Sequence, residues 1–122
     1  MYQLDKIKVT NSDERRDLTS LFNGGFQAKQ IKIIKVKRDS ILGNHYHNYR
    51  EMFYVLKGQA YYTLENIGTK EHKGMFLDIG DRLIIDSKIA HKAFLKTGTI
   101  TIEATESEYI SPEFNDKRYE VK

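Results

Sequence analysis

The segment 43–58, GNHYHNYREMFYVLKG, places two histidines one residue apart and a glutamate four residues after the second. In a β-strand alternate side chains share a face, so His45 and His47 point the same way, with their backbones about 7 Å apart. Glu51 lies on that face as well, unless a turn through the residues between them breaks the alternation. Two imidazoles and a carboxylate form a common ligand set for divalent first-row metals, and imidazole also transfers protons near neutral pH. The segment therefore predicts a metal site or a proton-transfer site.

A third histidine, His91, lies in GDRLIIDSKIAHKAF, a segment that predicts a strand, a turn and a second strand. A small barrel would bring this segment beside the first one, so His91 is a candidate for a further ligand. The fourth histidine, His72, lies in the charged sequence TKEHKG and is predicted to be a solvated surface residue.

Glu103 is a further candidate for chemistry. It lies in TITIEATESEYI, where strand alternation places it with threonines on one face and puts isoleucines on the other. If the apolar face packs against a partner sheet or a second chain, Glu103 points into a cavity near His91. The alternative is that the threonine and glutamate face is simply solvated.

The elements that must position these residues are short strands. A chain of 122 residues suits one domain, which we divide into an N-terminal arm (1–28), a barrel core (29–107) and a C-terminal tail (108–122). Strands are predicted at 31–37, 52–56, 59–64, 75–79, 83–86, 90–95 and 99–105. We expect 52–56 to pair with 59–64, and 90–95 with 99–105, as hairpins. Residues 13–22 are expected to form a short helix or an irregular arm that packs Leu18, Leu21 and Phe22. The pattern predicts an all-β sandwich or small barrel with little helix.

Composition excludes several classes of protein. The 20 basic and 17 acidic residues are interleaved, and this argues against a nucleic-acid partner; the alternating stretch 31–37 reads as a strand with a solvated lysine face. The absence of cysteine excludes disulfides and thiolate zinc sites. No apolar run approaches the roughly 20 residues that a membrane span needs, and the charged N-terminus lacks a signal peptide. We therefore expect a cytoplasmic protein that does not enter membranes.

The histidine segment resembles the first signature of the cupin superfamily, G-x5-H-x-H-x3,4-E-x6-G. His45, His47, Glu51 and Gly58 match at the expected spacing, although Gly43 stands closer to the first histidine than the leading glycine of the signature does. The segment GDRLIIDSKIAHKAFL is similar in part to the second signature, G-x5-P-x-G-x2-H-x3-N. Its first glycine and its histidine match, whereas its proline, second glycine and asparagine positions hold other residues.

The cupin resemblance implies a fold and a ligand set. The fold is a conical β-barrel, a double-stranded β-helix or jelly roll. The implied ligands are His45, His47, Glu51 and His91, which would hold a divalent ion such as Zn, Fe, Mn or Ni, or no metal in a cupin that uses histidine as an acid or base. Small cupins usually form dimers, and the apolar strand 31–37 would be an exposed edge if it were left unpaired. The resemblance thus implies a homodimer.

The histidine segment also resembles the cupin modules of polysaccharide-biosynthesis enzymes that isomerise or epimerise nucleotide-linked 4-keto-6-deoxy sugars. In the arm, Asp13 and Arg15 match the D-x-R-G-x-(L/F) segment of those enzymes, in which the arginine helps to hold the nucleotide phosphates; Arg16 replaces the glycine. In a metal-free site His45 or His47 would be the base that removes a proton beside the ketone. With all three histidines on a metal, Glu103 or a tyrosine would take that role.

Two other functions remain open on the sequence. A ligand set of three histidines and one glutamate leaves about two positions free on an octahedral ion, so a metal-dependent oxygenase is one alternative. The other is a non-catalytic module that binds a sugar or another small ligand.

Overall fold

A computed structural model describes residues 1–122, and strands dominate it. The strands are β1 (Tyr2–Lys6), β2 (Asn11–Ser12), β3 (Asp17–Leu18), β4 (Gln30–Lys35), β5 (Ser40–Tyr46), β6 (Glu51–Lys57), β7 (Ala60–Asn66), β8 (His72–Leu77), β9 (Asp81–Ile85), β10 (Ile89–Leu95), β11 (Ile100–Thr105) and β12 (Lys117–Arg118). The one helical segment, α1 (Pro112–Asn115), has four residues and is far too short to span a bilayer. The predicted all-β class with little helix is confirmed.

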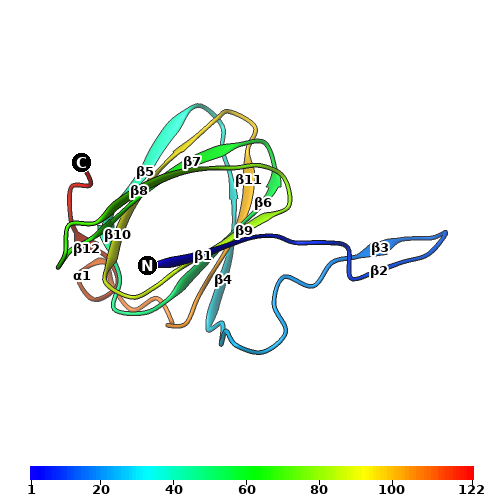
Figure 1. The fold of residues 1–122 in the computed structure, drawn as a ribbon, viewed down its shortest axis with the longest axis horizontal. Helices are drawn as coiled ribbons and strands as arrows, with labels where there is room; N and C mark the ends of the chain where they lie inside the picture. The colour runs from blue at the N-terminus through cyan, green and yellow to red at the C-terminus, as the bar shows by residue number, and fades with distance from the viewer.

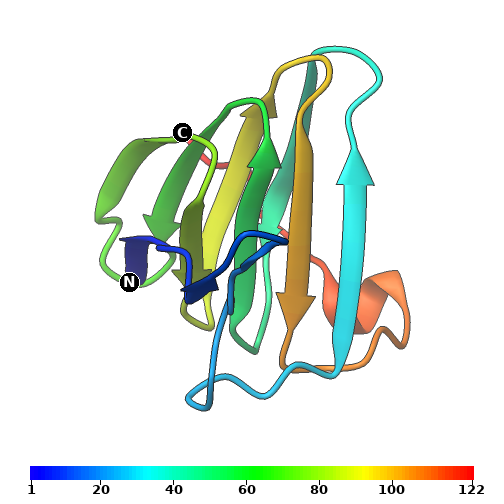
Figure 2. The ribbon, with the colours of Figure 1, turned by 90° about the vertical axis from the view of Figure 1, so that its right-hand side faces the viewer.

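The strands form two five-stranded antiparallel sheets and one small hairpin. The sheet orders are β1-β9-β6-β11-β4 and β12-β5-β10-β7-β8. Figure 1 looks into the ring that the two sheets form, and Figure 2 shows the long strands running side by side. Two facing antiparallel sheets with chain crossings between them make a jelly roll. β1, within the N-terminal arm, pairs with β9 and so belongs to the first sheet.

The main core fills the space between the two sheets. Each strand sends alternate side chains inward, and Val55, Leu64, Leu77 and Leu83 are completely buried there. Burying such a side chain contributes about 1.5–3 kcal/mol. A second, smaller cluster lies on the outer side of the first sheet, where arm residues that include Phe26 pack over Met52, Tyr54, Ile84 and Ala104.

The two predicted hairpins are wrong in their pairing. β6 pairs with β9 and β11, whereas β7 pairs with β8 and β10, so consecutive strands lie in different sheets. β10 and β11 are separated in the same way. Turn residues such as Gly58, with a φ of 87°, reverse the chain but do not decide whether the next strand joins the same sheet or the facing one.

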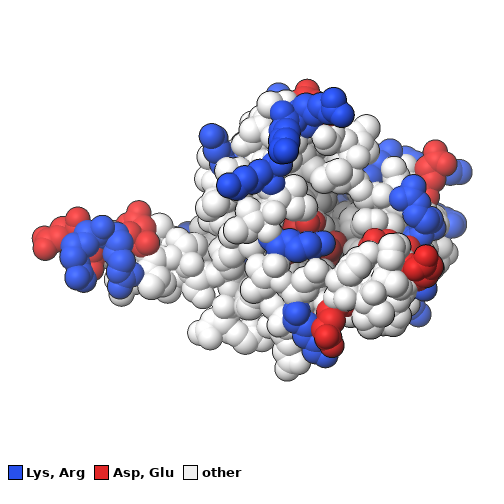
Figure 3. Space-filling view, turned by 180° about the vertical axis from the view of Figure 1, so that it is seen from behind, with Lys and Arg blue, Asp and Glu red and all other residues white.

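Residues 13–22 contain no helix. The carboxylate of Asp13 accepts hydrogen bonds from the backbone N–H groups of Arg15 (2.8 Å) and Arg16 (3.1 Å), a local turn that competes with helix formation. β2 and β3 flank this turn and form a hairpin that projects from the barrel (Figures 1 and 3). Leu21 and Phe22 pack against the second cluster as expected, but Leu18 is exposed on the hairpin.

Candidate active site

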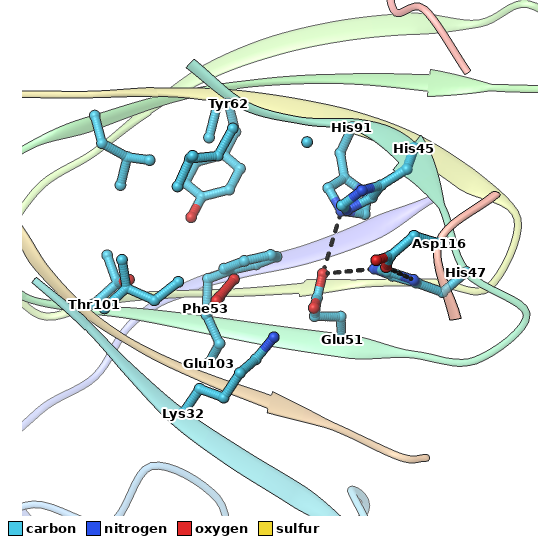
Figure 4. Close-up of a pocket in the computed structure, with 15 residues that line it drawn as sticks. Lys32, His45, His47, Glu51, Phe53, Tyr62, His91, Thr101, Glu103 and Asp116 are labelled. Atoms are coloured by element: carbon cyan, nitrogen blue, oxygen red, sulfur yellow. Dashed lines mark ion pairs between the residues drawn. The ribbon is translucent and has the colours of Figure 1, made fainter. Parts of the chain in front are cut away.

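A cavity of about 260 Å³ lies between the two sheets. Its lining residues are Lys32, Ile34, Leu42, Gly43, His45, His47, Glu51, Phe53, Tyr62, His91, Ala93, Leu95, Thr101, Glu103 and Asp116. The three histidines, Glu51 and Asp116 gather at one end of this cavity, and Glu103 and Lys32 lie away from them, beside Phe53 (Figure 4). Figure 3 shows a hollow in the barrel with acidic side chains inside it. A cavity of this size suits a small molecule.

A β-bulge turns His45 into the cavity. Gly43 and His45 pair with consecutive residues of β10, so Asn44 is an extra residue in β5. Asn44 and Gly43 have φ values of 58° and 103°, the backbone distortion that such a bulge needs. Leu42 and His45 therefore both line the cavity although they are three residues apart, and His45 lies directly opposite His91.

Glu51 connects the other two histidines. β5 ends before His47, and Glu51 is the first residue of β6, so the predicted strand over both histidines stops one residue early. The Glu51 Oε1 atom lies 3.3 Å from Nε2 of His47 and 3.2 Å from Nε2 of His91 (Figure 4). The His45 ring completes the group, with centroid distances of 4.6 Å to His47 and 4.8 Å to His91.

Backbone carbonyls hold the far side of two of these rings. Nδ1 of His47 lies 2.6 Å from the carbonyl oxygen of Asn115, and Nδ1 of His91 lies 3.1 Å from that of Ile89. A carbonyl can only accept, so each Nδ1 carries a hydrogen and each Nε2 faces Glu51. The two Nε2 atoms and Glu51 Oε1 are buried without a hydrogen-bond partner. Three electron-rich atoms so close together require a proton or a cation between them.

The pKa values of Glu51, His47 and His45 shift in different directions. Burial opposes the negative charge of Glu51, but its contacts with His47 and His91 lower its pKa overall. Burial likewise opposes the charge on His47, yet the Glu51 carboxylate and the Asn115 carbonyl raise its pKa above the ordinary value. Burial, helped by the nearby His91 and His47, lowers the pKa of His45 to about 3. The cavity thus holds a neutral imidazole beside one that favours the charged form.

Glu103 lies in the same cavity and is buried, so the expectation that it is simply solvated is wrong. Burial and the charge of Glu51 raise its pKa to about 8, although Lys32 opposes the shift. Lys32 pairs with Glu103 across β4 and β11, and both lie on the opposite side of the cavity from Tyr62 (Figure 4). This shift favours the protonated carboxyl at neutral pH, which is the form that can donate a hydrogen bond.

The donor set fits a divalent metal ion. One ligand atom from each of His45, His47 and His91 lies within 4.8 Å of the others. The partnerless Nε2 atoms of two of these rings and Oε1 of Glu51 are the atoms that an ion would use. The four residues that the cupin resemblance implies as ligands therefore lie together.

Arg15 lies elsewhere. It is at the turn of the projecting hairpin, its side chain is exposed and it forms an ion pair with Asp13 at 3.1 Å. It is not among the residues that line the cavity of its own chain. His72 is exposed, as predicted, and its ring contacts the carbonyl oxygen of Lys122.

Sequence reasoning missed several residues of the site. Asn115 and Asp116 belong to the C-terminal tail, which carries no strand or motif pattern, and Asp116 lies 3.6 Å from Nδ1 of His47. Tyr49 stacks on His47 with a ring distance of 4.9 Å. Lys32 could have been found, because alternation in 31–37 places it on the same face as Ile34, which lines the cavity.

No protein-family model and no curated protein matches the chain by sequence. Solved structures do resemble it. The TDP-quinovose 3,4-ketoisomerase of Campylobacter jejuni aligns with a TM-score of 0.82 at 17% identity, over 96% of this chain and 92% of that one. The TDP-fucose-3,4-ketoisomerase of the same organism gives 0.78 at 23% identity, over 93% and 86%.

A third structure, the dTDP-4-dehydrorhamnose 3,5-epimerase of Bacillus anthracis with TDP and pyrophosphate bound, gives a TM-score of 0.77 at 18% identity, over 93% of this chain and 76% of that one. Sequence identities this low establish a shared fold. The predicted cupin-type jelly roll, similar to the folds of sugar-nucleotide isomerases and epimerases, is confirmed.

Proposed function

We propose that this protein is a sugar-nucleotide isomerase that transfers a proton between neighbouring carbons of a nucleotide-linked 4-keto-6-deoxy sugar. The observation that carries the proposal is the contact of His45 and His47 in one cavity, with ring centroids 4.6 Å apart, where burial lowers the pKa of His45 and the Glu51 carboxylate raises that of His47. The structural similarities support it, since the names of both ketoisomerases and of the epimerase give a TDP- or dTDP-linked sugar as the substrate. The chain spans 92% and 86% of the two ketoisomerases and 76% of the epimerase.

The reaction needs two kinds of proton transfer. A ketone at C4 acidifies the hydrogen on C3, so neutral His45 can take that proton while an acid protonates O4, and an enediol forms. Return of the carbon proton to C4 and loss of the hydroxyl proton from O3 complete the shift of the carbonyl from C4 to C3. No atoms are gained or lost, and no oxidant is needed.

Two groups in the cavity can protonate the oxygen. The His47 imidazolium presents its Nε2 proton next to Glu51, whose negative charge balances it. The protonated Glu103 carboxyl lies on another side of the cavity and can hold the second oxygen by a hydrogen bond. We assign His45 as the carbon base, His47 as the acid and Glu103 as the hydrogen-bond donor.

A metal-bound form of the site uses the same residues differently. His45, His47, His91 and Glu51 would hold the ion. A divalent ion supplies Lewis-acid polarisation of a ketone oxygen. The three imidazoles are then ligands, and Glu103 is the remaining base in the cavity.

We further propose that the protein acts as a homodimer and that Arg15 binds the phosphates of the nucleotide. Arg15 belongs to the hairpin of β2 and β3, which projects from the barrel (Figure 1), so this role requires an assembly that brings the hairpin to the mouth of a cavity. A second copy of the chain is the simplest such assembly.

Solvent deuterium exchange tests the reaction. The protein is incubated in deuterated buffer with a panel of TDP-linked 4-keto-6-deoxy sugars, and the products are read by NMR. We expect deuterium at C3 of the recovered substrate and at C4 of a product whose carbonyl has moved to C3, both abolished in His45→Asn. His72→Asn, which changes the exposed fourth histidine, is the matched control and should keep full activity.

The other outcomes separate the alternatives. Deuterium at C3 and C5 with the carbonyl retained at C4 would indicate an epimerase. Binding of the sugar nucleotide without any exchange would indicate a non-catalytic module. No exchange and no binding across the panel would overturn the proposal.

A further inference from the structure

The ring of His47 is not fixed by its own strand. β5 ends at Tyr46, so His47 lies on the connection to β6. The ring is nevertheless buried, with Nδ1 hydrogen-bonded to the Asn115 carbonyl at 2.6 Å and Tyr49 stacked on one face. The residue that fixes it comes from the C-terminal tail, 68 positions later in the chain.

Asn115 is itself held firmly. Its side chain is almost completely buried, and all of its hydrogen-bonding groups are used. Oδ1 accepts from the backbone N–H groups of Ile110 (2.7 Å) and Ser111 (3.1 Å). Nδ2 donates to the Tyr49 hydroxyl (2.8 Å) and to the Glu108 carbonyl (3.0 Å). A buried polar side chain with every partner satisfied rigidifies its surroundings, so the Asn115 carbonyl is a fixed acceptor.

The same tail also holds the bulge that turns His45 inward. The backbone N–H of Tyr119 donates to the Asn44 carbonyl at 2.9 Å, and that of Val121 donates to Asn44 Oδ1 at 3.1 Å. Val121 is buried, and Lys92 of β10 donates to its carbonyl at 2.9 Å. The tail therefore contacts the extra residue of the bulge from outside the barrel.

We infer that the C-terminal tail is a positioning element of the active site. The Asn115 carbonyl holds the Nδ1 proton of His47. The only proton that this ring can exchange is then the one on Nε2, which faces the cavity. The inference rests on the proposed function only for its kinetic consequence. The assignment of the Nδ1 proton applies to a ring that transfers a proton and equally to one that binds a metal through Nε2.

The test combines a spectroscopic and a kinetic measurement on the full-length chain. Nitrogen-15 NMR at a pH where His47 is neutral should find the hydrogen on Nδ1 in the natural protein. In Asn115→Ala we expect a mixture of Nδ1–H and Nε2–H forms. With a reactive sugar nucleotide, kcat should fall about 10- to 100-fold, the range typical of residues that orient a working histidine, while KM changes little.

Two further variants guard against simple misfolding. Asn115→Asp keeps an acceptor for the N–H groups of Ile110 and Ser111, so it should fold and recover part of the Nδ1–H form. Asn66→Ala is the matched control, because Asn66 Oδ1 also accepts from two backbone N–H groups of a turn, those of Gly68 and Thr69. It should lower stability without changing the His47 spectrum.

The outcomes are decisive in both directions. An Nε2–H form in the natural protein would overturn the inference, as would an unchanged Nδ1–H form in a folded Asn115→Ala. If Asn115→Ala does not fold, Asn115→Asp decides, and a spectrum and kcat both equal to those of the natural protein would overturn the inference. The NMR result needs no substrate, so a failure of the proposed reaction leaves it intact and is recognised separately.

Discussion

Glu51 Oε1 lies 3.3 Å from Nε2 of His47 and 3.2 Å from Nε2 of His91, and all three atoms are buried. The contact with His47 supports the proposed role of His47 as the acid, because the Glu51 carboxylate offsets the cost of burying a charged imidazole. In Glu51→Gln that compensation is lost, so burial should take the pKa of His47 below its ordinary value. NMR titration of the His47 ring measures the change. We expect kcat at neutral pH to fall by about 100-fold or more, the usual contribution of a general acid.

The control for that change is Glu106→Gln. Glu106 forms an ion pair with Arg50 at 2.8 Å outside the cavity, so the variant removes a carboxylate but leaves the histidines alone. Its His47 titration should match that of the natural protein. A His47 pKa unchanged in Glu51→Gln would contradict the assignment of His47 as the acid.

Glu103 should make the protein less stable as the pH rises. Its pKa in the folded chain is about 8, above the ordinary value of 4.5, so the folded state binds the proton more tightly than the unfolded state. Its contribution is therefore most favourable below pH 4.5 and is lost progressively up to about pH 8, at a rate of at most about 1.4 kcal/mol per pH unit. Glu103→Gln removes this dependence. Urea unfolding from pH 4.5 to 8.5 should give a flatter curve for the variant, and parallel curves would show that Glu103 is not protonated in the fold.

Sequence periodicity was enough for most strands of the two sheets, but not for β1 in the predicted arm or for the pairing of strands. The alternation that places Phe53 and Val55 inward is a local property, since side chains follow a period of two along any strand. Whether β7 continues the sheet of β6 or crosses to the facing sheet depends on the closure of the whole barrel. A short turn such as the one at Gly58 can connect two strands of one sheet or two strands in facing sheets. The turn sequence alone therefore could not predict which strands pair.

The site shows the same division between local and distant causes. The spacing of His45 and Glu51 could be read directly, and a second signature supplied His91. The bulge at Asn44 could not be predicted from alternation, because it shifts the inward face by one residue. Asn115 carries no local signal, since its role arises only when the tail returns to β5.

Gly43→Ala should lower the free energy of unfolding by more than the positive φ of residue 43 alone would cause. A Cβ at Gly43 would lie 2.6 Å from the carbonyl oxygen of His91, so β5 must move away from β10. Gly98→Ala is the matched control, because Gly98 also has a positive φ, 86°, and a Cβ there meets nothing within 4 Å. We expect Gly98→Ala to cost about 1–2 kcal/mol with normal activity, from the backbone conformation. Gly43→Ala should cost about 1–3 kcal/mol more, from the steric clash, and should lower kcat. Equal losses in the two variants, measured by urea unfolding, would contradict the role of the bulge.

The donor set predicts that the protein binds one divalent ion. Addition of Zn²⁺ to chelated protein should raise its thermal unfolding temperature, because a ligand at 100 times its Kd stabilises the folded state by about 2.7 kcal/mol. His91→Ala should lose this shift and His72→Ala should keep it. An unchanged unfolding temperature at saturating Zn²⁺ would exclude the four-ligand site.

The proposed reaction uses side chains alone, so chelated protein should retain deuterium exchange. An activity that returns only with metal would instead assign the base to Glu103.

The homodimer prediction rests on the edge strand β4. β4 ends the first sheet and has a neighbour on one side only, and the outward side chains of Ile31 and Ile33 are about two-thirds exposed, at 64% and 65%. An exposed apolar edge favours pairing with another chain. Sedimentation velocity at micromolar concentration should therefore give twice the mass of the chain, and Ile33→Lys should shift it towards the monomer. Ile41→Lys is the matched control, because Ile41 is equally exposed, at 65%, but lies on the second sheet. A monomer mass for the natural protein would remove the dimer, and with it the proposed contact of Arg15 with the nucleotide phosphates of a neighbouring chain.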